Sequence, residues 1–418
     1  MSWEIKKLSE VCQIKPPKKE AKQKLAESDL VSFVPMSNLG IGTKKITLNE
    51  DRPLGKVVGS YTYFSEDDVL LAKITPCFEN GKLGIARNLT NGIGFGSSEY
   101  VVFRSKGEIE PDYLFYFLSR DTFRNEGARV MSGAVGHKRI PKEFIEDYSL
   151  SVPPIAEQKQ IVAILDEAFE RIDGAIANTE KNLANARELF ESYLNAIFTR
   201  KGRGWRDLTL QEISAKFSRG KSKHRPRGDQ KLYGGKYPFI QTSDIGNSKH
   251  RIIDYSQTYN DFGLAQSELW PRGTVCIAIV GANIAETAIL EFDACFPDSV
   301  IGIVVNSDIA SSDYVEYLLQ FFKSEIKAKG KGAARENINM GTFANQRFPF
   351  PDLETQKAIA CQLDELSFQS ERIEEVYQQK LAALNELKQS ILQKAFSGEL
   401  TADTAAQAAN AAQEVTAA

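Results

Sequence analysis

Apolar residues recur at intervals of three and four along two stretches of the chain, about 153–199 and 351–400. In the first stretch they are Ile161, Leu165, Ala168, Ile172, Ile176, Leu183, Ala186, Phe190, Leu194 and Ile197. In the second they are Ile359, Leu363, Leu366, Ile373, Tyr377, Leu381, Leu384, Ile391 and Ala395. This is the spacing of a heptad seam, and each stretch is therefore predicted to be one helix on the order of 65–70 Å long. A helix with a single apolar stripe needs a partner, so we expect the two helices to cover each other.

The two stretches are copies of one another. The sequence VPPIAEQKQIVAILDE begins at Val152, and FPDLETQKAIACQLDE begins 198 residues later at Phe350. The match continues without a gap for about 45 positions, and it pairs Gln158 with Gln356 and Phe198 with Phe396. An internal duplication of this length predicts a chain built from two equivalent halves.

The segments before and between these helices alternate between apolar and polar residues over short runs. In the first segment the runs are SFVPMSNLG, DVLLAKI, KLGIAR and SEYVVFRS, and the second segment echoes them with FIQTSDIG and TVCIAIV. Such runs predict strands of a mixed or antiparallel sheet, and DYLFYFLSRDTFR after Pro111 predicts one helix. The expected organisation is α+β, with a globular segment at 1–150, a helix at 151–203, a second globular segment at 204–349, a second helix at 350–400 and a disordered tail at 401–418.

Composition narrows the class of protein without naming a function. The chain has 418 residues, of which 42% are hydrophobic and 26% charged, as in globular proteins of two or three domains. No apolar run approaches the roughly 18 residues of a membrane helix, and the first residues lack a secretory signal, so we expect a cytoplasmic protein without a membrane partner. Five scattered cysteines without a CxxC pair favour neither a disulfide framework nor a zinc site.

Motifs of common enzymes are missing. The sequence has no phosphate-binding GxxxxGK[ST] loop, no HExxH pair and no Asn/Asp-Pro-Pro-Tyr/Phe signature of amino-methyltransferases. The order of Asp298, Glu325 and Lys327 is that of a metal-dependent nuclease motif, and this alternative stays open. Apart from it, we expect no catalytic residue and no metal ligand in this chain.

A strongly basic stretch points towards nucleic acid. The net charge is −3, but Lys201–Lys236 holds eleven basic residues against three acidic ones. Phosphate backbones attract such a surface, and its centre, SRGKSKHRPRGD, has too many Gly and Pro residues for a buried element. A scaffold that joins two protein-binding modules is a third interpretation, against which this basic surplus counts.

Each globular segment also carries small polar and basic residues after a matched strand. These are the residue types that read base edges in a DNA groove. They are Ser37, Asn38, Lys44 and Lys45 in the first segment, and Thr242, Ser243, Lys249, His250 and Arg251 in the second.

The two helical copies, with PPIAEQ at the start of one and AFSGEL at the end of the other, resemble the conserved regions of specificity subunits of type I restriction-modification systems. The resemblance covers nearly all of residues 1–400, with two departures: PDLETQ opens the second copy and AIFTRKG ends the first. It implies two target-recognition domains that each bind one half of a bipartite, asymmetric DNA site. Two antiparallel helices in a coiled coil would separate them with pseudo-twofold symmetry and dock DNA-adenine methyltransferase subunits, two in number, and the complex would recruit an ATP-driven endonuclease subunit. The chain itself would hold no cofactor, whereas the complex would use S-adenosylmethionine, ATP and Mg²⁺ through its other subunits.

The resemblance also suggests which residues face the DNA and which face the partners. In the first half the DNA-binding candidates are Lys18, Lys19, Lys22, Ser37, Asn38, Lys44, Lys45, Lys73, His137, Lys138 and Arg139. In the second half they are Arg219, Lys221, Lys223, Arg225, Arg227, Thr242, Ser243, Lys249, Arg251, Lys331, Arg335 and Asn337. The partner-docking candidates are Gln158, Lys159, Gln356 and Lys357.

Overall fold

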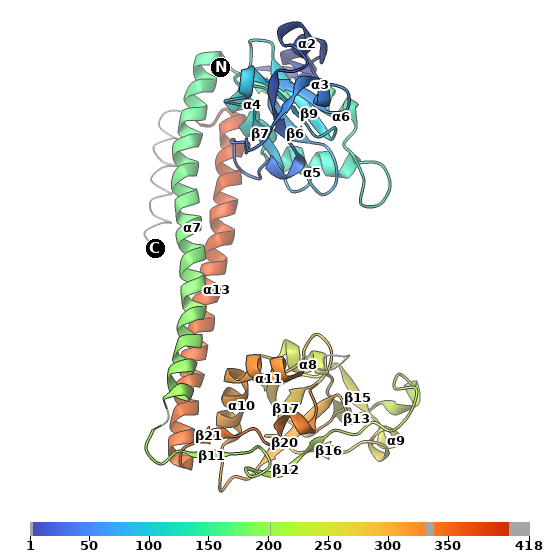
Figure 1. The fold of residues 1–418 in the computed structure, drawn as a ribbon, viewed down its shortest axis with the longest axis vertical. Helices are drawn as coiled ribbons and strands as arrows, with labels where there is room; N and C mark the ends of the chain where they lie inside the picture. The colour runs from blue at the N-terminus through green and yellow to red at the C-terminus, as the bar shows by residue number, and fades with distance from the viewer. Residues whose placement is uncertain (1–2, 201, 331–337, 401–418) are drawn as a thin grey trace. The chain divides into compact units, whose positions relative to one another are not determined.

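The computed structural model describes residues 3–200, 202–330 and 338–400, and its main feature is a pair of long helices (Figure 1). Helix α7 is Ile155–Thr199 and helix α13 is Leu353–Ser397, both close to their predicted bounds. None of the described helices is long and apolar enough to span a membrane. The predicted tail at 401–418 lies outside the described residues.

The predicted seam is buried or half-buried at every position but one. Ile373 is 44% exposed, and its predicted place in the seam is wrong. The residues that meet α7 at this height are Ser370, which donates a hydrogen bond to the carbonyl of Ala186 (3.4 Å), and Glu374, which pairs with Arg187 (3.0 Å). Polar contacts replace apolar ones here, so hydrophobic spacing alone points to the wrong residue.

The chain forms two compact units, and each unit takes part of both long helices. Unit 1 comprises Met1–Glu180 and Gln378–Ala418, and unit 2 comprises Lys181–Tyr377. In unit 2 the helices are antiparallel, because Arg187 of α7 meets Glu374 while Tyr193, further along α7, meets Gln362, further back on α13. In unit 1 the first half of α7 packs in one core with the last third of α13. The boundaries of the units fall inside the two long helices, not between a helix and a globular segment. They therefore do not test the predicted segment boundaries, which stay a prediction.

Unit 1 contains a strand pair and two four-stranded sheets. β1 (Glu4–Lys7) pairs antiparallel with β10 (Ser149–Val152), which fastens the start of the chain to the strand that leads into α7. The first sheet has the order β2-β9-β6-β7 and the second β4-β3-β8-β5. Their strands are β2 (Cys12–Ile14), β9 (Tyr100–Ser105), β6 (Val69–Ala72), β7 (Leu83–Ile85), β4 (Asp51–Pro53), β3 (Leu30–Val34), β8 (Ile93–Gly96) and β5 (Thr62–Ser65).

Unit 2 repeats this arrangement. β11 (Arg206–Leu208) pairs antiparallel with β21 (Phe348–Phe350) before α13. One sheet has the order β12-β20-β17-β18-β14 and the other β15-β13-β19-β16, so the first sheet gains one edge strand over its equivalent in unit 1. The strands are β12 (Ser214–Arg219), β20 (Val300–Val305), β17 (Val275–Ala278), β18 (Thr287–Leu290), β14 (Arg251–Ile252), β15 (Gln257–Tyr259), β13 (Tyr233–Phe239), β19 (Ala294–Cys295) and β16 (Leu269–Trp270).

Short helices join these strands. In unit 1 they are α1 (Leu8–Val11), α2 (Lys19–Lys24), α3 (Leu54–Val57), α4 (Pro111–Leu118), α5 (Asp121–Val130), α6 (Lys142–Asp147) and the 3₁₀ turns η1 (Met36–Asn38) and η2 (Thr90–Gly92). In unit 2 they are η3 (Gln230–Leu232), α8 (Thr242–Asn247), α9 (Asp261–Ala265), α10 (Ser312–Phe321), α11 (Lys323–Gly330) and α12 (Met340–Phe343). The single helix predicted after Pro111 is two helices, because Arg120 between α4 and α5 adopts an extended conformation.

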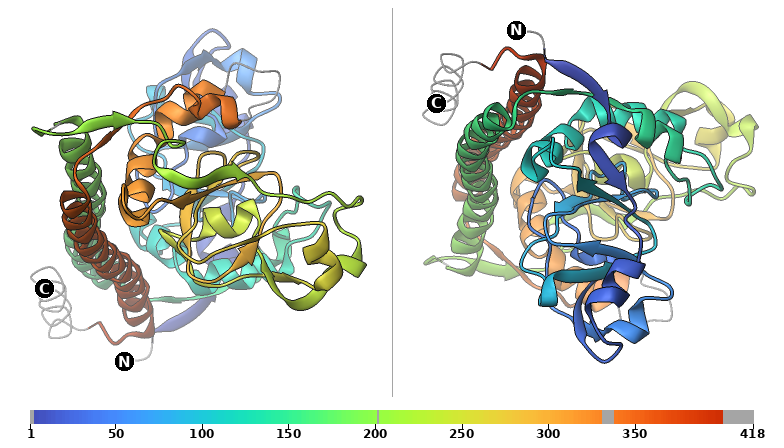
Figure 2. Two further views of the ribbon diagram at one scale, coloured as in Figure 1. Left: turned by 90° about the horizontal axis from the view of Figure 1, so that it is seen from below. Right: turned by 90° about the horizontal axis from the view of Figure 1, so that it is seen from above.

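Helices α4 and α10 lie between the long helices and the sheets of their own unit (Figures 1 and 2). Tyr113 of α4 packs edge-on against Phe396 of α13, with ring centroids 4.9 Å apart. In unit 2 Tyr314 of α10 packs on Phe198 of α7 at 5.6 Å. Phe198 and Phe396 are the matched ends of the two sequence copies, so each globular segment is completed by the end of a long helix. The predicted class, an α+β protein of two mixed domains with long antiparallel helices, is confirmed.

A group of ion pairs fixes α4 to α7 in unit 1. Asp112 at the start of α4 receives hydrogen bonds from Arg87 and lies 2.9 Å from the Lys44 ammonium, which also pairs with Asp166 of α7. Burial acts to raise the pKa of Asp112, but the hydrogen bonds from Arg87 and Lys44 outweigh it, and the net effect is a lowered pKa. The folded state therefore favours the ionised carboxylate.

Replacing a seam leucine should destabilise the isolated chain, whereas replacing an exposed leucine of the same helix should not. Leu165 is fully buried and Leu189 is 63% exposed, and both belong to α7. We expect Leu165→Ala to lower the free energy of unfolding by about 2–5 kcal/mol, because it leaves a cavity, and Leu189→Ala to change it by less than about 0.5 kcal/mol. Urea denaturation followed by circular dichroism measures both, and equal effects of the two substitutions would contradict the assigned seam.

Asp112→Asn should remove a part of the stability that depends on pH. A carboxylate whose folded pKa is lowered stabilises the fold above its unfolded pKa, near 3.8, and this contribution is lost as the pH falls through the still lower folded pKa. The variant should therefore melt at a lower temperature than the parent chain at pH 7, and the difference should shrink below about pH 4. Thermal melts between pH 7 and pH 3 test this, with the exposed Asp147→Asn as the control. A difference that is constant across this range would be the contrary result.

Candidate nucleic-acid interface

Basic residues of unit 1 gather at one edge of its first sheet. Strands β2 and β6 both run antiparallel to β9, so the ends of β2 and β6 and the start of β9 share an edge. Lys15 follows β2, Lys73 follows β6, and Glu99 precedes β9. The loop that carries the candidates His137, Lys138 and Arg139 joins the same edge, because the Lys73 carbonyl accepts a hydrogen bond from the amide of Ile140 (3.0 Å).

One acidic residue organises the cations at this edge. Arg139 donates two hydrogen bonds to the carboxylate of Glu99 (2.9 and 2.8 Å), and the Lys73 ammonium bonds the carbonyl of Ser98 (3.0 Å). Burial, opposed by Glu99, lowers the pKa of Lys73, and the positive charges of Lys15 and Arg139 lower it further. Burial and the charge of Lys15 likewise lower the pKa of Lys18. The cations are thus close enough to repel one another, which is the electrostatic character of an anion-binding surface. We call the set Lys15, Lys18, Lys73, His137, Lys138 and Arg139 basic edge 1.

Unit 2 carries basic residues at the equivalent edge of its matched sheet. Strand β12 ends at Arg219, β17 ends at Ala278 and β20 begins at Val300, with the same antiparallel pairing. The backbone bonds correspond as well: the amide of Ile279 donates to Ser299 (3.0 Å) as that of Lys73 donates to Glu99 (2.9 Å). The predicted basic stretch of unit 2 therefore lies where unit 1 places Lys15.

Three arginines of this edge surround Asp298. The Arg219 side chain donates to the Asp298 carbonyl (2.6 Å), Arg227 pairs with the Asp298 carboxylate, and Arg225 lies 3.9 Å from it. All three arginines are exposed. One carboxylate cannot neutralise three guanidinium groups, so the edge keeps a positive surplus. We call the set Arg219, Arg225 and Arg227 basic edge 2. Of the neighbouring candidates, Lys221 pairs with Glu268 (2.9 Å) and Lys223 is exposed.

Other predicted DNA-binding residues lie apart from these sets or outside the described residues. Lys19 and Lys22 are exposed on α2, and Ser37 lies in η1, where Asn38 is bonded to Thr47 and Asn49. Thr242 and Ser243 begin α8. Lys331, Arg335 and Asn337 fall outside the residues that the structure describes. Lys45 is exposed beside Lys44.

A further group of predicted DNA-binding residues is paired with acidic residues of the long helices or of α4 and α10. Lys44 is bound to Asp112 and Asp166, with its ammonium 4.5 Å from the centre of the Tyr116 ring. In unit 2 Lys249 pairs with Glu371 of α13 (2.7 Å) and Arg251 with Asp313 of α10 (2.6 Å). These cations are already matched by acidic residues of their own unit, which leaves less charge for phosphate groups.

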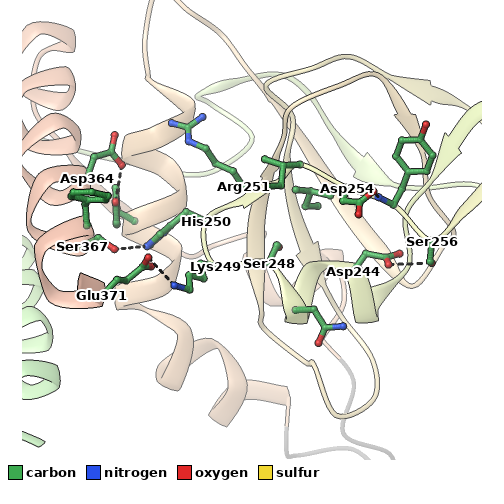
Figure 3. A pocket seen from close by; sticks show the side chains of 16 residues that line it. Asp244, Ser248, Lys249, His250, Arg251, Asp254, Ser256, Asp364, Ser367 and Glu371 are labelled. Atoms are coloured by element: carbon green, nitrogen blue, oxygen red, sulfur yellow. Dashed lines mark hydrogen bonds and ion pairs between the residues drawn. The ribbon is translucent and has the colours of Figure 1, made fainter. Parts of the chain in front are cut away.

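His250 occupies the position in unit 2 that Lys44 has in unit 1, beside a pocket of about 640 Å³ (Figure 3). Its ring bonds Ser367 of α13 (3.2 Å) on one side and Glu316 of α10 (3.0 Å) on the other. Burial raises the pKa of Glu316, and the hydrogen bond from His250 opposes the rise. Sequence reasoning missed Glu316, whose one signal is an acidic residue within the apolar helix DYVEYLLQF, and it also missed Lys15, Glu99 and the role of Asp298.

The four partner-docking candidates divide into two kinds. Gln158 and Gln356 are fully buried, and both ends of each side-chain amide are hydrogen-bonded within their own unit. This burial leaves neither amide accessible to another protein, so the structure gives these glutamines an anchoring role. Lys159 is exposed and pairs with Glu110 (3.2 Å), and Lys357 is exposed.

The nuclease alternative is not supported. Asp298 is held by the arginines of basic edge 2, whereas Glu325 lies on α11 and pairs with Lys329 (2.8 Å). Among the described residues, no group of three or more His, Cys, Asp or Glu side chains could hold a metal ion.

Comparisons with known proteins agree with this arrangement. The family described as the type I restriction modification DNA specificity domain matches residues 1–184 and 202–382. The EcoEI specificity subunit of a type I restriction enzyme from Escherichia coli is 33% identical over 196 residues, which are 47% of this chain and 32% of that protein. A putative type I restriction enzyme MjaX specificity subunit from Methanocaldococcus jannaschii is 24% identical over 351 residues, 81% of this chain and 79% of that one. The chain matches about a third of the length of its Escherichia coli relatives EcoEI and EcoAI.

Solved structures share the fold. The crystal structure of the HsdS subunit from Thermoanaerobacter tengcongensis superimposes with a TM-score of 0.60 at 20% identity, and covers 96% of this chain and 97% of its own. A chain from a study of complex assembly and conformational transition of the type I R-M system superimposes with a TM-score of 0.77 at 20% identity, covering 94% and 97%. With two copies of the family's domain across most of its length, this chain belongs to the type I restriction-modification DNA specificity family.

Proposed function

We propose that this chain is the DNA-binding specificity subunit of a type I restriction-modification complex, and that each unit reads one half of a bipartite, asymmetric DNA site. The observation that carries the proposal is the placement of basic edges 1 and 2 at the same edge of two matched sheets. The two edges have the same place in the fold but different side chains, as expected for a protein that binds a DNA site with two different halves. Because α7 and α13 each contribute residues to both units, their length would contribute to the spacer between the half-sites.

The chemistry of the edges suits contact with phosphates and bases. Arginine binds phosphate through two parallel hydrogen bonds, and it also binds guanine in the major groove. Asp298 holds Arg219 and Arg227 before DNA arrives, so less side-chain entropy is lost on binding. Glu99 does the same for Arg139 in unit 1.

The relatives are named as specificity subunits of restriction enzymes, which supports a role within a larger complex. We propose that the chain assembles with two DNA-adenine methyltransferase subunits and with endonuclease subunits in the cytoplasm. It would be non-catalytic by itself. S-adenosylmethionine, ATP and Mg²⁺ would act through those other subunits.

Removing two arginines of basic edge 2 should weaken DNA binding in a way that depends on salt. We expect the double variant Arg225→Ala/Arg227→Ala to lower the affinity of the complex for duplex DNA and to reduce the slope of log K against log salt by about 2, because two phosphate contacts are lost. Fluorescence anisotropy titrations at salt concentrations from about 50 to about 200 mM measure the affinity and its slope. Lys181→Ala, which removes an exposed cation of α7, should leave the slope unchanged. A double variant with the parent slope would exclude this edge from the interface.

The bipartite site itself can be observed directly. In a cell that carries the chain with its methyltransferase subunits, methylation sequencing should reveal adenine methylation in one motif of two defined halves with an undefined spacer. Exchanging residues 204–349 for the same segment of a related subunit should change one half of the motif and leave the other intact. A change in both halves, or the absence of any bipartite motif, would contradict the assignment of one half per unit.

A further inference from the structure

A single buried side-chain amide bonds three backbone groups at the start of each long helix. In unit 1 the amide oxygen of Gln158 accepts a hydrogen bond from the backbone of Glu110 (2.8 Å), the residue before α4. Its nitrogen donates to the carbonyls of Glu108 (2.9 Å) and Pro153 (2.8 Å). The start of α7 is thereby bonded to the segment that leads into α4.

Unit 2 reproduces these bonds with Gln356. Its amide oxygen accepts from the backbone of Ser311 (3.0 Å), the residue before α10, and its nitrogen donates to Ile309 (3.0 Å) and Pro351 (2.9 Å). Both glutamines are fully buried. The glutamines belong to the two matched helical copies, whereas the backbone groups that they bind before α4 and α10 belong to globular segments whose sequences differ widely. The attachment has therefore been kept although the segments it holds have diverged.

The chemistry of these bonds needs an amide. A glutamine side chain offers an acceptor oxygen and two N–H donors on one planar group, and here it uses all three. A glutamate of the same shape would face two carbonyl oxygens without a proton to give. Because a buried backbone group without a hydrogen-bond partner destabilises the fold, no other side chain of this size fits the position without loss.

A second attachment lies two turns further along each helix. Tyr116 of α4 donates its hydroxyl to Asp166 of α7, and Tyr317 of α10 donates to Asp364 of α13 (2.7 Å). The glutamine and the aspartate are eight residues apart on each long helix, which corresponds to about 12 Å. Because α4 and α10 are each held at two separated points on a long helix, neither can rotate freely about one of these points.

We propose that Gln158 and Gln356 are positioning residues that set the angle at which each basic edge is presented to DNA, and that they thereby determine how strictly the complex selects its spacer length. This inference rests on the proposed function. Both glutamines are fully buried, so each acts through the orientation of α4 or α10 and of the sheet packed on that helix. The tyrosine hydroxyls are the second point of the same attachment.

The test uses the complete complex with its methyltransferase subunits and a panel of duplexes that carry the spacer of the parent motif or one that is a base pair longer or shorter. The parent complex should strongly prefer its own spacer. Small errors of position cost factors of about ten or more in rate, and these errors penalise the wrong spacers in the parent complex. Gln158→Ala should reduce the preference by about this factor, because a globular segment that has lost one of its two attachments can adjust to a spacer of another length. The preference for the correct bases within each half should stay the same. Gln160→Ala, which removes an exposed glutamine of the same helix turn, is the matched control and should keep the parent preference.

The outcomes separate the inference from the proposed function. If Gln158→Ala assembles and lowers thermal stability but discriminates spacers like the parent, the glutamine is only structural and the inference is overturned. If that variant fails to fold, Tyr116→Phe decides, since it removes a single hydroxyl; an unchanged spacer preference in Tyr116→Phe overturns the inference as well. If the parent complex itself methylates no bipartite site, the proposed function fails, and the inference falls with it.

Discussion

The fold depends on the burial of one apolar stripe on each long helix. A stripe of this length cannot be buried by a lone helix, and the helices solve this by pairing antiparallel, as Arg187–Glu374 and Tyr193–Gln362 show in unit 2. As a result, each core contains residues from distant parts of the sequence. The core of unit 1 contains Phe396, Leu392 and Leu400 from the far end of the sequence, and the core of unit 2 contains Phe198 from the end of α7. The first globular segment is therefore completed by residues that follow the second segment in the sequence, and the second is completed by residues that precede it.

Hydrophobic spacing predicts the parts of the fold that repeat a simple period. It locates the ends of α7 and α13 within three residues, and also most of the central strands, because burial on one face imposes that period on the sequence. It fails where polar contacts or backbone breaks decide the structure. Ile373 is exposed because Ser370 and Glu374 meet α7 in its place. The break at Arg120 leaves no periodic signal because it is a change of backbone conformation at a single residue. The pairing of β1 with β10 leaves none because the two strands are distant in the sequence.

Composition alone predicts the candidate interface only where it lies in one continuous stretch; the residues of basic edge 1 other than Lys15 are named through the family resemblance. The arginines of basic edge 2 stand out by composition, whereas basic edge 1 is assembled from a strand end, another strand end and a distant loop. Counting basic residues in the sequence also does not distinguish those that are free from those that form ion pairs with acidic residues. Lys44, Lys249 and Arg251 have the residue types of a DNA-binding site, yet acidic residues of the long helices and of α4 and α10 pair with each of them. Only the folded arrangement brings those acids to them.

The two units share the bonds that hold α4 and α10 to the long helices, but they differ in the side chains of their basic edges. The bonds of Gln158 and Tyr116 recur with Gln356 and Tyr317, atom for atom. The glutamines and the aspartates lie in the two matched helical copies, whereas most of the globular sequence that they hold has changed. At the basic edges the opposite holds, since Lys73, Arg139 and Glu99 in unit 1 give way to arginines around Asp298 in unit 2. A constraint shared by both units must act on the attachment, because two segments that diverge freely would not retain the same three-way amide bond. No such shared pattern is present at the edges, as we expect if each edge binds a different DNA sequence.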